Sequence, residues 1–364
     1  MELAAKMTTS SVPTIKQALY AGTPKANDTT PFIIAEMSGN HNASLERALR
    51  MVDIAAEAGA DAVKLQTFKP ETMTLNVKKE GFTVTAEKSL WKGRELFSLF
   101  KEAQTAWEWH KPIFERAKER GILCFSSAFD ESSVDFLEEM GAPAYKIASF
   151  ECTDVPLIRY VAQTGKPMII STGMASLGEI EDAVGAARDG GCTNLTLLKC
   201  TSTYPATPET SNLLTIPHMK SLFGCDIGLS DHTLGIGAAI AAVAFGATVI
   251  EKHYTIARAD GGVDSAFSLE PDEFKSLVTE TKVAHAALGR ISYGASAEEQ
   301  HARSKRRSLY IAADMAKGDI LTKDNLKRIR PGLGLAPKYY ESMLGRRVNR
   351  DLEIGTPFTL ELIG

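Results

Sequence analysis

Short apolar runs alternate with longer amphipathic stretches from residue 31 to about residue 288. The runs have the length and the β-branched content of strands that are buried on both faces, and helix-capping residues such as Ser176 and Glu179 stand in the stretches between them. Strand–helix units repeated over about 255 residues match the size of an α/β protein with a (β/α)8 TIM barrel. The eight predicted strands are residues 32–36, 62–66, 123–126, 144–147, 168–171, 195–199, 227–229 and 249–252.

The same pattern divides the chain into a leader (1–30), the barrel (31–288), a polar linker (289–304) and a small C-terminal domain (305–364). The last segment holds 12 Lys and Arg against 7 Asp and Glu, a local charge of +5 that leaves −9 on the remainder. One connection inside the barrel, which contains residues 67–91, is too long for an ordinary loop and predicts a lid or an insertion.

Composition excludes several classes of protein. A net charge of −4, from 41 Lys and Arg against 45 Asp and Glu, gives no overall reason to expect a nucleic acid or an anionic membrane as partner. The sequence lacks an apolar run of about 20 residues and an apolar signal-peptide core in residues 1–30, so we expect a cytoplasmic protein. The five cysteines include no CxxC pair and are interpreted as reduced core thiols.

Polar residues end every predicted strand, where TIM barrels carry their active sites. Lysines and hydroxyls that converge there indicate an anion, such as a phosphate or a carboxylate. The turn at 171–173, followed by a helix start, adds backbone donors suited to phosphate. The candidates from the strand ends are Glu36, Lys64, Gln66, Lys146, Ser149, Glu151, Ser171, Ser202, Tyr204, Ser230, His232 and His253.

The two histidines predict a metal site. His232 and His253 end neighbouring strands, so their rings could meet about 3–5 Å apart and share a divalent ion, with Glu36 beside them and open positions for substrate. Two imidazoles with oxygen ligands favour Mn²⁺, with Co²⁺ or Mg²⁺ as alternatives.

Several stretches resemble the sialic acid synthase family, the nonulosonic acid synthases. They are residues 32–41, 58–67, 145–149, 171–174, 200–205, 228–235 and 250–254, and the match continues to the end of the chain, where the tail looks like the family's antifreeze-like (SAF) domain. Departures are the long leader and Ala128, which stands where proline is commoner in the family. Within the family, residues 90–91, 94–96, 109–110, 125–127, 199–203 and 267–269 look most like the branch that makes pseudaminic acid.

The resemblance implies a reaction. The family condenses phosphoenolpyruvate with an open-chain amino sugar, with the help of a divalent metal, and releases phosphate. For this branch the sugar is 2,4-diacetamido-2,4,6-trideoxy-L-altrose, and an N-acetylneuraminate or legionaminate synthase is the alternative. Two alternatives lie outside the family. One is a metal-dependent aldolase, and the other is a sugar- or metal-binding protein without catalytic activity.

The resemblance also implies roles for single residues. Phosphoenolpyruvate would contact Lys64, Lys146, Ser149, Ser171, Ser202 and Ser230, and the metal would bind His232 and His253. Glu36 would position water or move protons. Gln66, Glu151, Tyr204 and Asp264 would contact substrate, and Arg330 in the tail would reach the sugar's N-acetyl group. The family further implies a homodimer with exchanged tails, in which Arg330 completes the partner's site.

Overall fold

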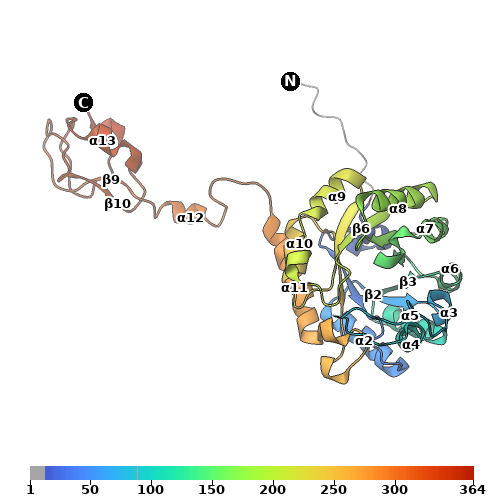
Figure 1. Cartoon of the computed structure of the whole chain (residues 1–364). Helices are drawn as coiled ribbons and strands as arrows, with labels where there is room; N and C mark the ends of the chain where they lie inside the picture. The colour runs from blue at the N-terminus through green and yellow to red at the C-terminus, as the bar shows by residue number, and fades with distance from the viewer. Residues whose placement is uncertain (1–12, 88) are drawn as a thin grey trace. The chain divides into compact units, whose positions relative to one another are not determined.

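The computed structural model describes residues 13–87 and 89–364, and the chain forms two compact units, Met1–Gly289 and Arg290–Gly364. In the first unit, parallel strands β1 to β8 pair in sequence order, and β8 pairs back to β1 to close a barrel. Helices surround this barrel (Figure 1). The predicted TIM barrel is therefore confirmed.

Five of the strands (β2, β3, β6, β7 and β8) extend slightly beyond the apolar runs that predicted them, because backbone pairing continues into the polar residues at their ends, whereas β4 is one residue shorter than predicted. The strands are β1 Phe32–Glu36, β2 Ala62–Thr67, β3 Leu123–Ala128, β4 Tyr145–Ile147, β5 Met168–Ser171, β6 Leu195–Cys200, β7 Asp226–Asp231 and β8 Val249–His253.

Capping residues set where the surrounding helices start and stop. The Ser44, Asp130, Asp154 and Ser176 side chains each accept a hydrogen bond from a backbone N–H in the first turn of a helix, and Gly59 ends α2 at a φ of 88°. The main helices of this unit are α2 Leu45–Ala58, α3 Pro70–Met73, α4 Leu96–Ala103, α5 Trp107–Glu119, α6 Glu131–Glu139, α7 Val155–Ala162, α8 Leu177–Asp189, α9 Thr215–Phe223, α10 Gly237–Ala244 and α11 Pro271–Leu288.

Alternation along the strands separates two cores. Phe32 and Ile34 of β1 belong to the cluster inside the barrel, whereas Ile33 and Ala35 belong to the layer between the barrel and its helices. At the next inward position Glu36 replaces the apolar side chain. The barrel interior is thus apolar below and polar at its C-terminal end, which positions the site described next.

The described part of the leader packs at the opposite end of the barrel. Helix α1, Ile15–Leu19, places Ile15 in the interior cluster with Phe32. Its neighbour Lys16 is buried and forms ion pairs with Asp28, at 2.7 Å, and Asp61, at 3.6 Å. Residues 13–30 therefore close the barrel's N-terminal end, while residues 1–12 of the predicted leader lie outside the described residues.

The second unit has its own small core. Antiparallel strands β9 (Ser308–Ile311) and β10 (Leu326–Ile329) pack with α13 (Tyr340–Met343) around Leu309 and Phe358. A short helix, α12 (Gln300–Arg303), lies in the segment predicted as a linker. Nowhere in residues 13–87 and 89–364 is a helix both long and apolar enough to cross a membrane.

We predict that acid destabilises the fold through two buried histidines. Burial lowers the pKa values of His41 and His110 to about 4, below the value of about 6.5 in an unfolded chain. Between pH 6.5 and 4 the unfolded state therefore binds more protons, so stability is complete above pH 6.5 and falls toward pH 4 by at most about 3 kcal/mol for each histidine.

Denaturant unfolding of His110→Gln at pH 7 and pH 4.5 measures this contribution. The pH-dependent loss should be about 2 kcal/mol smaller than in the wild type. His218→Gln is the control, because His218 is exposed on α9. Equal losses in the two variants would contradict the assignment.

Candidate active site

Four charged side chains lie together in the polar end of the barrel. Lys64 Nζ is 2.6 Å from Glu36 Oε2 and 3.8 Å from Glu251 Oε2, and Lys146 Nζ is 3.7 Å from Glu251 Oε1. All four are buried. We call these four residues the charge quartet. Its charges balance, because buried ions are tolerated only when they are paired and hydrogen-bonded.

Hydroxyl groups surround the quartet. Lys64 donates to Ser127 Oγ at 3.1 Å, Lys146 donates to Ser171 Oγ at 2.7 Å, and Ser230 Oγ donates to Glu251 at 2.9 Å. The two ammonium groups thus share their surroundings with rotatable O–H donors, an arrangement suited to a multiply charged anion.

Two more serines, Ser149 after β4 and Ser202 after β6, lie against the turn that follows β5. Ser149 and Ser202 lie in hydrogen-bond contact, with their Oγ atoms 2.8 Å apart. Gly173 has a φ of 41°, and a Cβ there would lie 2.5 Å from both Ser149 Cβ and Ser202 Oγ. Only glycine fits this approach, so the predicted turn 171–173 does lie against the serines expected to bind phosphate.

A hydrogen-bond chain connects Glu36 to the loop after β8. Gln66 Nε2 donates to Glu36 Oε1 at 2.8 Å and to Ser38 Oγ at 3.1 Å, and Ser38 in turn donates to Asp264. Asp264 lies beside His253. Glu36, Gln66 and Asp264, predicted from distant parts of the sequence, therefore belong to one network.

The two glutamates of the quartet have opposite pKa shifts. Burial raises the pKa of Glu36 above its usual value, although Lys64 opposes the change. Burial also acts to raise the pKa of Glu251, but the charges of Lys146 and Lys64 outweigh it and hold that pKa below its usual value. Neighbouring carboxyls with separated pKa values can serve as one proton carrier and one permanent anion. The electrostatics favour Glu36 as the carrier.

Glu151 is a second carboxyl group that holds a proton readily. It lies in the turn Ser149–Thr153 after β4, and burial raises its pKa to about 7. Among the described residues, its Oε2 atom is buried without a hydrogen-bond partner. Glu151 can therefore change protonation near neutral pH.

The two predicted metal ligands face each other, with ring centroids 5.3 Å apart. His232 Nδ1 donates to the Thr201 carbonyl at 2.9 Å, so Nε2 is the ring nitrogen that could bind a metal. Burial acts to lower the pKa of His232, but the contact with Cys200 outweighs it and raises that pKa. In the described part of the chain, His253 Nδ1 lacks a hydrogen-bond partner, and Asp264 Oδ2 lies 3.7 Å from it. Burial and the nearby His232 hold the pKa of His253 well below its usual value, so its ring is neutral.

These two imidazoles fit a divalent ion as an incomplete ligand set. The described residues contain no group of three or more His, Cys, Asp or Glu side chains arranged to hold a metal. Glu36 is the register partner of His253 and is bonded to Lys64 and Gln66, so its place beside a bound metal stays a prediction. A bound ion would take its remaining ligands from water or substrate.

Aromatic rings form a wall beside the histidines. The Tyr204 ring centroid lies 4.4 Å from that of His232, and the Phe267 centroid lies 5.0 Å from that of His253. Trp91 comes from the long β2–α4 connection, and its ring centroid lies 5.8 Å from that of Tyr204. Its Nε1–H donates to the Val263 carbonyl. The predicted insertion therefore folds against the site.

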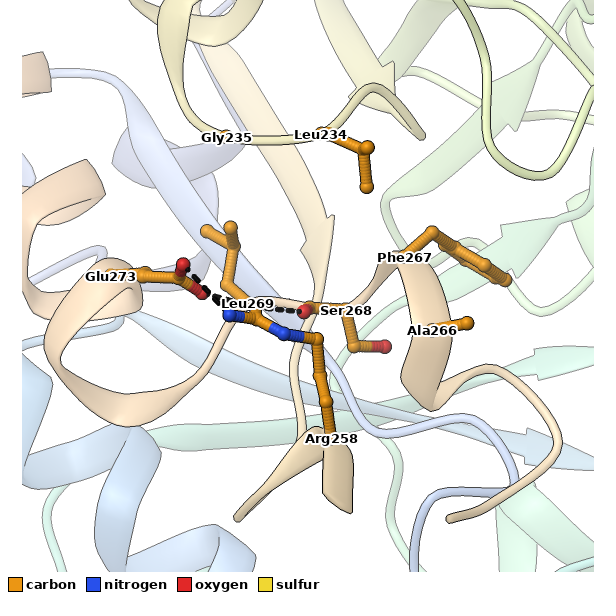
Figure 2. A pocket seen from close by; sticks show the side chains of 8 residues that line it. All are labelled: Leu234, Gly235, Arg258, Ala266, Phe267, Ser268, Leu269 and Glu273. Atoms are coloured by element: carbon orange, nitrogen blue, oxygen red, sulfur yellow. Dashed lines mark hydrogen bonds and ion pairs between the residues drawn. The ribbon is translucent and has the colours of Figure 1, made fainter. Parts of the chain in front are cut away.

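A cavity of about 300 Å³ opens next to Phe267 (Figure 2). Leu234 contributes one side and Leu269 another, and the Arg258 guanidinium is held within the cavity wall by Glu273. The cavity thus offers apolar surface with one fixed cation close to the aromatic wall.

The structure brings most of the sequence candidates together. Lys64, Gln66, Lys146, the serines, Tyr204, Asp264 and the histidines are linked by the contacts above, and Arg330 lies in the second unit. Residues 125–127 look like the pseudaminate branch, but within this motif Phe125 is part of the apolar interior and Ser126 bonds to Thr67. Only Ser127 of that motif contacts the quartet.

Sequence reasoning left Glu251 and Ser127 out of its set of site residues. Both occupy inward positions at strand ends, in phase with His253 and Phe125 respectively. A strict period of two along β8 and β3 would have identified them.

Two family models and several known proteins match this chain. The model of the NeuB family matches residues 51–293, and the model of the SAF domain matches residues 306–363. A pseudaminic acid synthase of Campylobacter jejuni subsp. jejuni serotype O:23/36 (strain 81-176) is 43% identical over 328 residues, covering 90% of this chain and 95% of the relative.

Two further proteins of this group are also similar. An N,N'-diacetyllegionaminic acid synthase of Campylobacter jejuni subsp. jejuni serotype O:2 is 38% identical over 318 residues, covering 86% of this chain and 94% of the relative. The crystal structure of an N-acetylneuraminic acid synthetase from Leptospira borgpetersenii, in complex with citrate, is 36% identical with a TM-score of 0.67, covering 75% of this chain and 90% of the other.

Proposed function

This chain belongs to the NeuB family and carries a SAF domain, and from that premise we propose that it makes pseudaminic acid. The substrates are phosphoenolpyruvate and 2,4-diacetamido-2,4,6-trideoxy-L-altrose, and phosphate is released. The observation that carries the proposal is the charge quartet with its ring of serines beside two histidines that face each other. Two lysines and several hydroxyls suit the phosphate and carboxylate of phosphoenolpyruvate better than they suit a neutral sugar alone.

The reaction forms one carbon–carbon bond and breaks one carbon–oxygen bond. C3 of phosphoenolpyruvate attacks C1 of the open-chain sugar, and the aldehyde oxygen takes up a proton. Water then adds at C2 of the former phosphoenolpyruvate and loses a proton. The resulting intermediate collapses by cleavage of the C2–O bond, so the bridging oxygen leaves with phosphate.

Residues of the quartet divide this work. Lys64, Lys146 and the serines hold phosphoenolpyruvate by charge-assisted hydrogen bonds. Glu36, whose pKa is raised by burial, passes a proton to the oxygen on C1 and takes one back from the water that adds at C2. Gln66 orients Glu36. Glu151, Tyr204 and Asp264 contact the sugar.

His232 and His253 would hold a divalent metal, Mn²⁺ in our proposal, with Co²⁺ or Mg²⁺ as alternatives. The ion supplies positive charge that polarises the sugar aldehyde and offsets negative charge as it develops. The Thr201 carbonyl orients His232 for this role by fixing its tautomer.

We place the enzyme in the cytoplasm. All five cysteines carry free thiols, which supports a reducing compartment.

A homodimer with exchanged tails completes the proposal, with Arg330 serving the partner's site. Two observations support it. The tail carries a local charge of +5, suited to anionic substrates. In addition, large apolar side chains are exposed in the loops after β4 to β7, which is typical of a surface that another surface covers. They are Phe150, Met174, Leu214 and Leu234.

Sugar preference is the first prediction of the proposed function. The enzyme should use the pseudaminate precursor with a kcat/KM at least about tenfold above that for N-acetylmannosamine, because a 6-deoxy sugar presents a methyl group that suits apolar surface such as Phe267 and its neighbouring cavity. Mass spectrometry of the keto-acid products and phosphate release would be measured for both sugars and for the legionaminate precursor.

Reactions without sugar provide the control, since an aldolase or an idle binding protein would show no sugar-dependent phosphate release. Equal or better turnover of N-acetylmannosamine or of the legionaminate precursor would reject the pseudaminate assignment while leaving the synthase chemistry in place.

Metal dependence is the second prediction. Chelation should lower turnover on the order of 1,000-fold, and Mn²⁺, Co²⁺ or Mg²⁺ should restore it, because several kcal/mol of charge stabilisation are lost with the ion. His232→Ala should not recover on adding Mn²⁺, whereas His218→Ala, an exposed control on α9, should. Full activity of chelated His232→Ala protein would show that no metal is needed there.

Subunit complementation is the third prediction. His232→Ala and Arg330→Ala should each be defective alone, yet a mixed dimer with exchanged tails contains one site with neither change. Co-refolding equal amounts should recover up to about a quarter of wild-type activity if subunits pair at random. No recovery, with mixed dimers demonstrated by size exclusion of differently tagged chains, would mean that Arg330 acts within its own chain or has no role.

A further inference from the structure

A buried ion pair lies on the outer side of the two strands that carry the histidines. Asp231 of β7 and Lys252 of β8 are direct partners in the strand register, and Lys252 Nζ is 2.6 Å from Asp231 Oδ2. Each residue immediately precedes one of the histidines. Because side chains alternate along a strand, the pair faces the surrounding helices while His232 and His253 face the interior.

The pair also fixes the backbone beyond His232. Asp231 Oδ1 accepts hydrogen bonds from Thr233 N, at 2.9 Å, and from Thr233 Oγ1, at 2.8 Å. Lys252, from the neighbouring strand, donates to the Thr233 carbonyl. Both backbone polar groups of Thr233 are therefore held by the ion pair. His232 is bound between this anchor and its own contacts to Thr201 and Ala206.

Packing alone does not account for such a pair. Both side chains are at most 2% exposed, and removing two ions from water costs several kcal/mol for each, so apolar residues of similar size would fill the space at least as favourably. Apolar residues would not supply the directional bonds to Thr233. The benefit that only the charged pair gives is a defined position for the ends of β7 and β8.

We propose that Asp231 and Lys252 are positioning residues for a divalent ion: they set the separation and direction of His232 and His253, and through them the affinity for the metal. This inference rests on the metal role of the histidines in the proposed function. Neither residue touches the reacting atoms.

Binding of Mn²⁺ alone, without substrates, tests the inference on the full chain. Electron paramagnetic resonance of the free aquo ion gives the dissociation constant. Lys252→Met should weaken Mn²⁺ binding about 10- to 100-fold, the usual effect of losing a residue that orients a metal ligand. The double variant Asp231→Asn/Lys252→Met should weaken Mn²⁺ binding by a similar factor. It contains no unpaired buried charge, so this loss of affinity would not come from an uncompensated ion.

Lys16→Met is the matched control. Lys16 is also buried and paired, 2.7 Å from Asp28, but it lies at the N-terminal end of the barrel. This variant should lose a comparable amount of stability in a thermal melt and bind Mn²⁺ like the wild type. Equal weakening in Lys16→Met and Lys252→Met would show a general stability effect and overturn the proposal.

The double variant decides the matter if Lys252→Met does not fold. A folded double variant with wild-type affinity for Mn²⁺ overturns the positioning role. Wild-type protein that binds no Mn²⁺ would instead remove Mn²⁺ from the proposed function and overturn this inference, while synthase activity measured separately would still stand.

Discussion

The balance of charge inside the barrel is the constraint on which the site depends. Two lysines and two glutamates are buried together, and each ammonium group contacts at least one carboxylate. Removing either partner would leave an uncompensated buried ion. A multiply charged anion that enters must therefore take over contacts that Lys64 and Lys146 now make with Glu36 and Glu251. Binding and protonation of the glutamates are physically linked in such a site.

Much of the fold could be predicted because its signal is local. The apolar runs and helix caps are readable within windows of a few residues, and the structure changed the strand ends by only one or two positions. The convergence of polar groups also follows, since all strands of a parallel barrel end on the same side. Glu251, a polar residue at the end of β8, received no site role although its signal was present, two residues before His253 on the same face of the strand.

Other parts of the site depend on contacts that no local pattern contains. Trp91 meets Val263 across 172 residues of sequence, and nothing in the segment 67–91 specifies that partner. Motifs that resemble a family carry the opposite risk. Phe125 and Ser126 mark the resemblance, but one fills the barrel interior and the other bonds behind β3. A residue can thus identify a relative without touching the substrate.

The two faces of β7 and β8 show why the period of two matters for chemistry as well as for folding. Inward positions hold Ser230, Glu251 and His253, and the outward positions between them hold Asp231 and Lys252. A shift of one residue in β7 would turn His232 toward the helices and Asp231 into the barrel, and a shift in β8 would do the same to His253 and Lys252. The outer pair bonds across both strands and resists that shift, so the same contact that orders the strand ends also keeps the inner side chains facing one another.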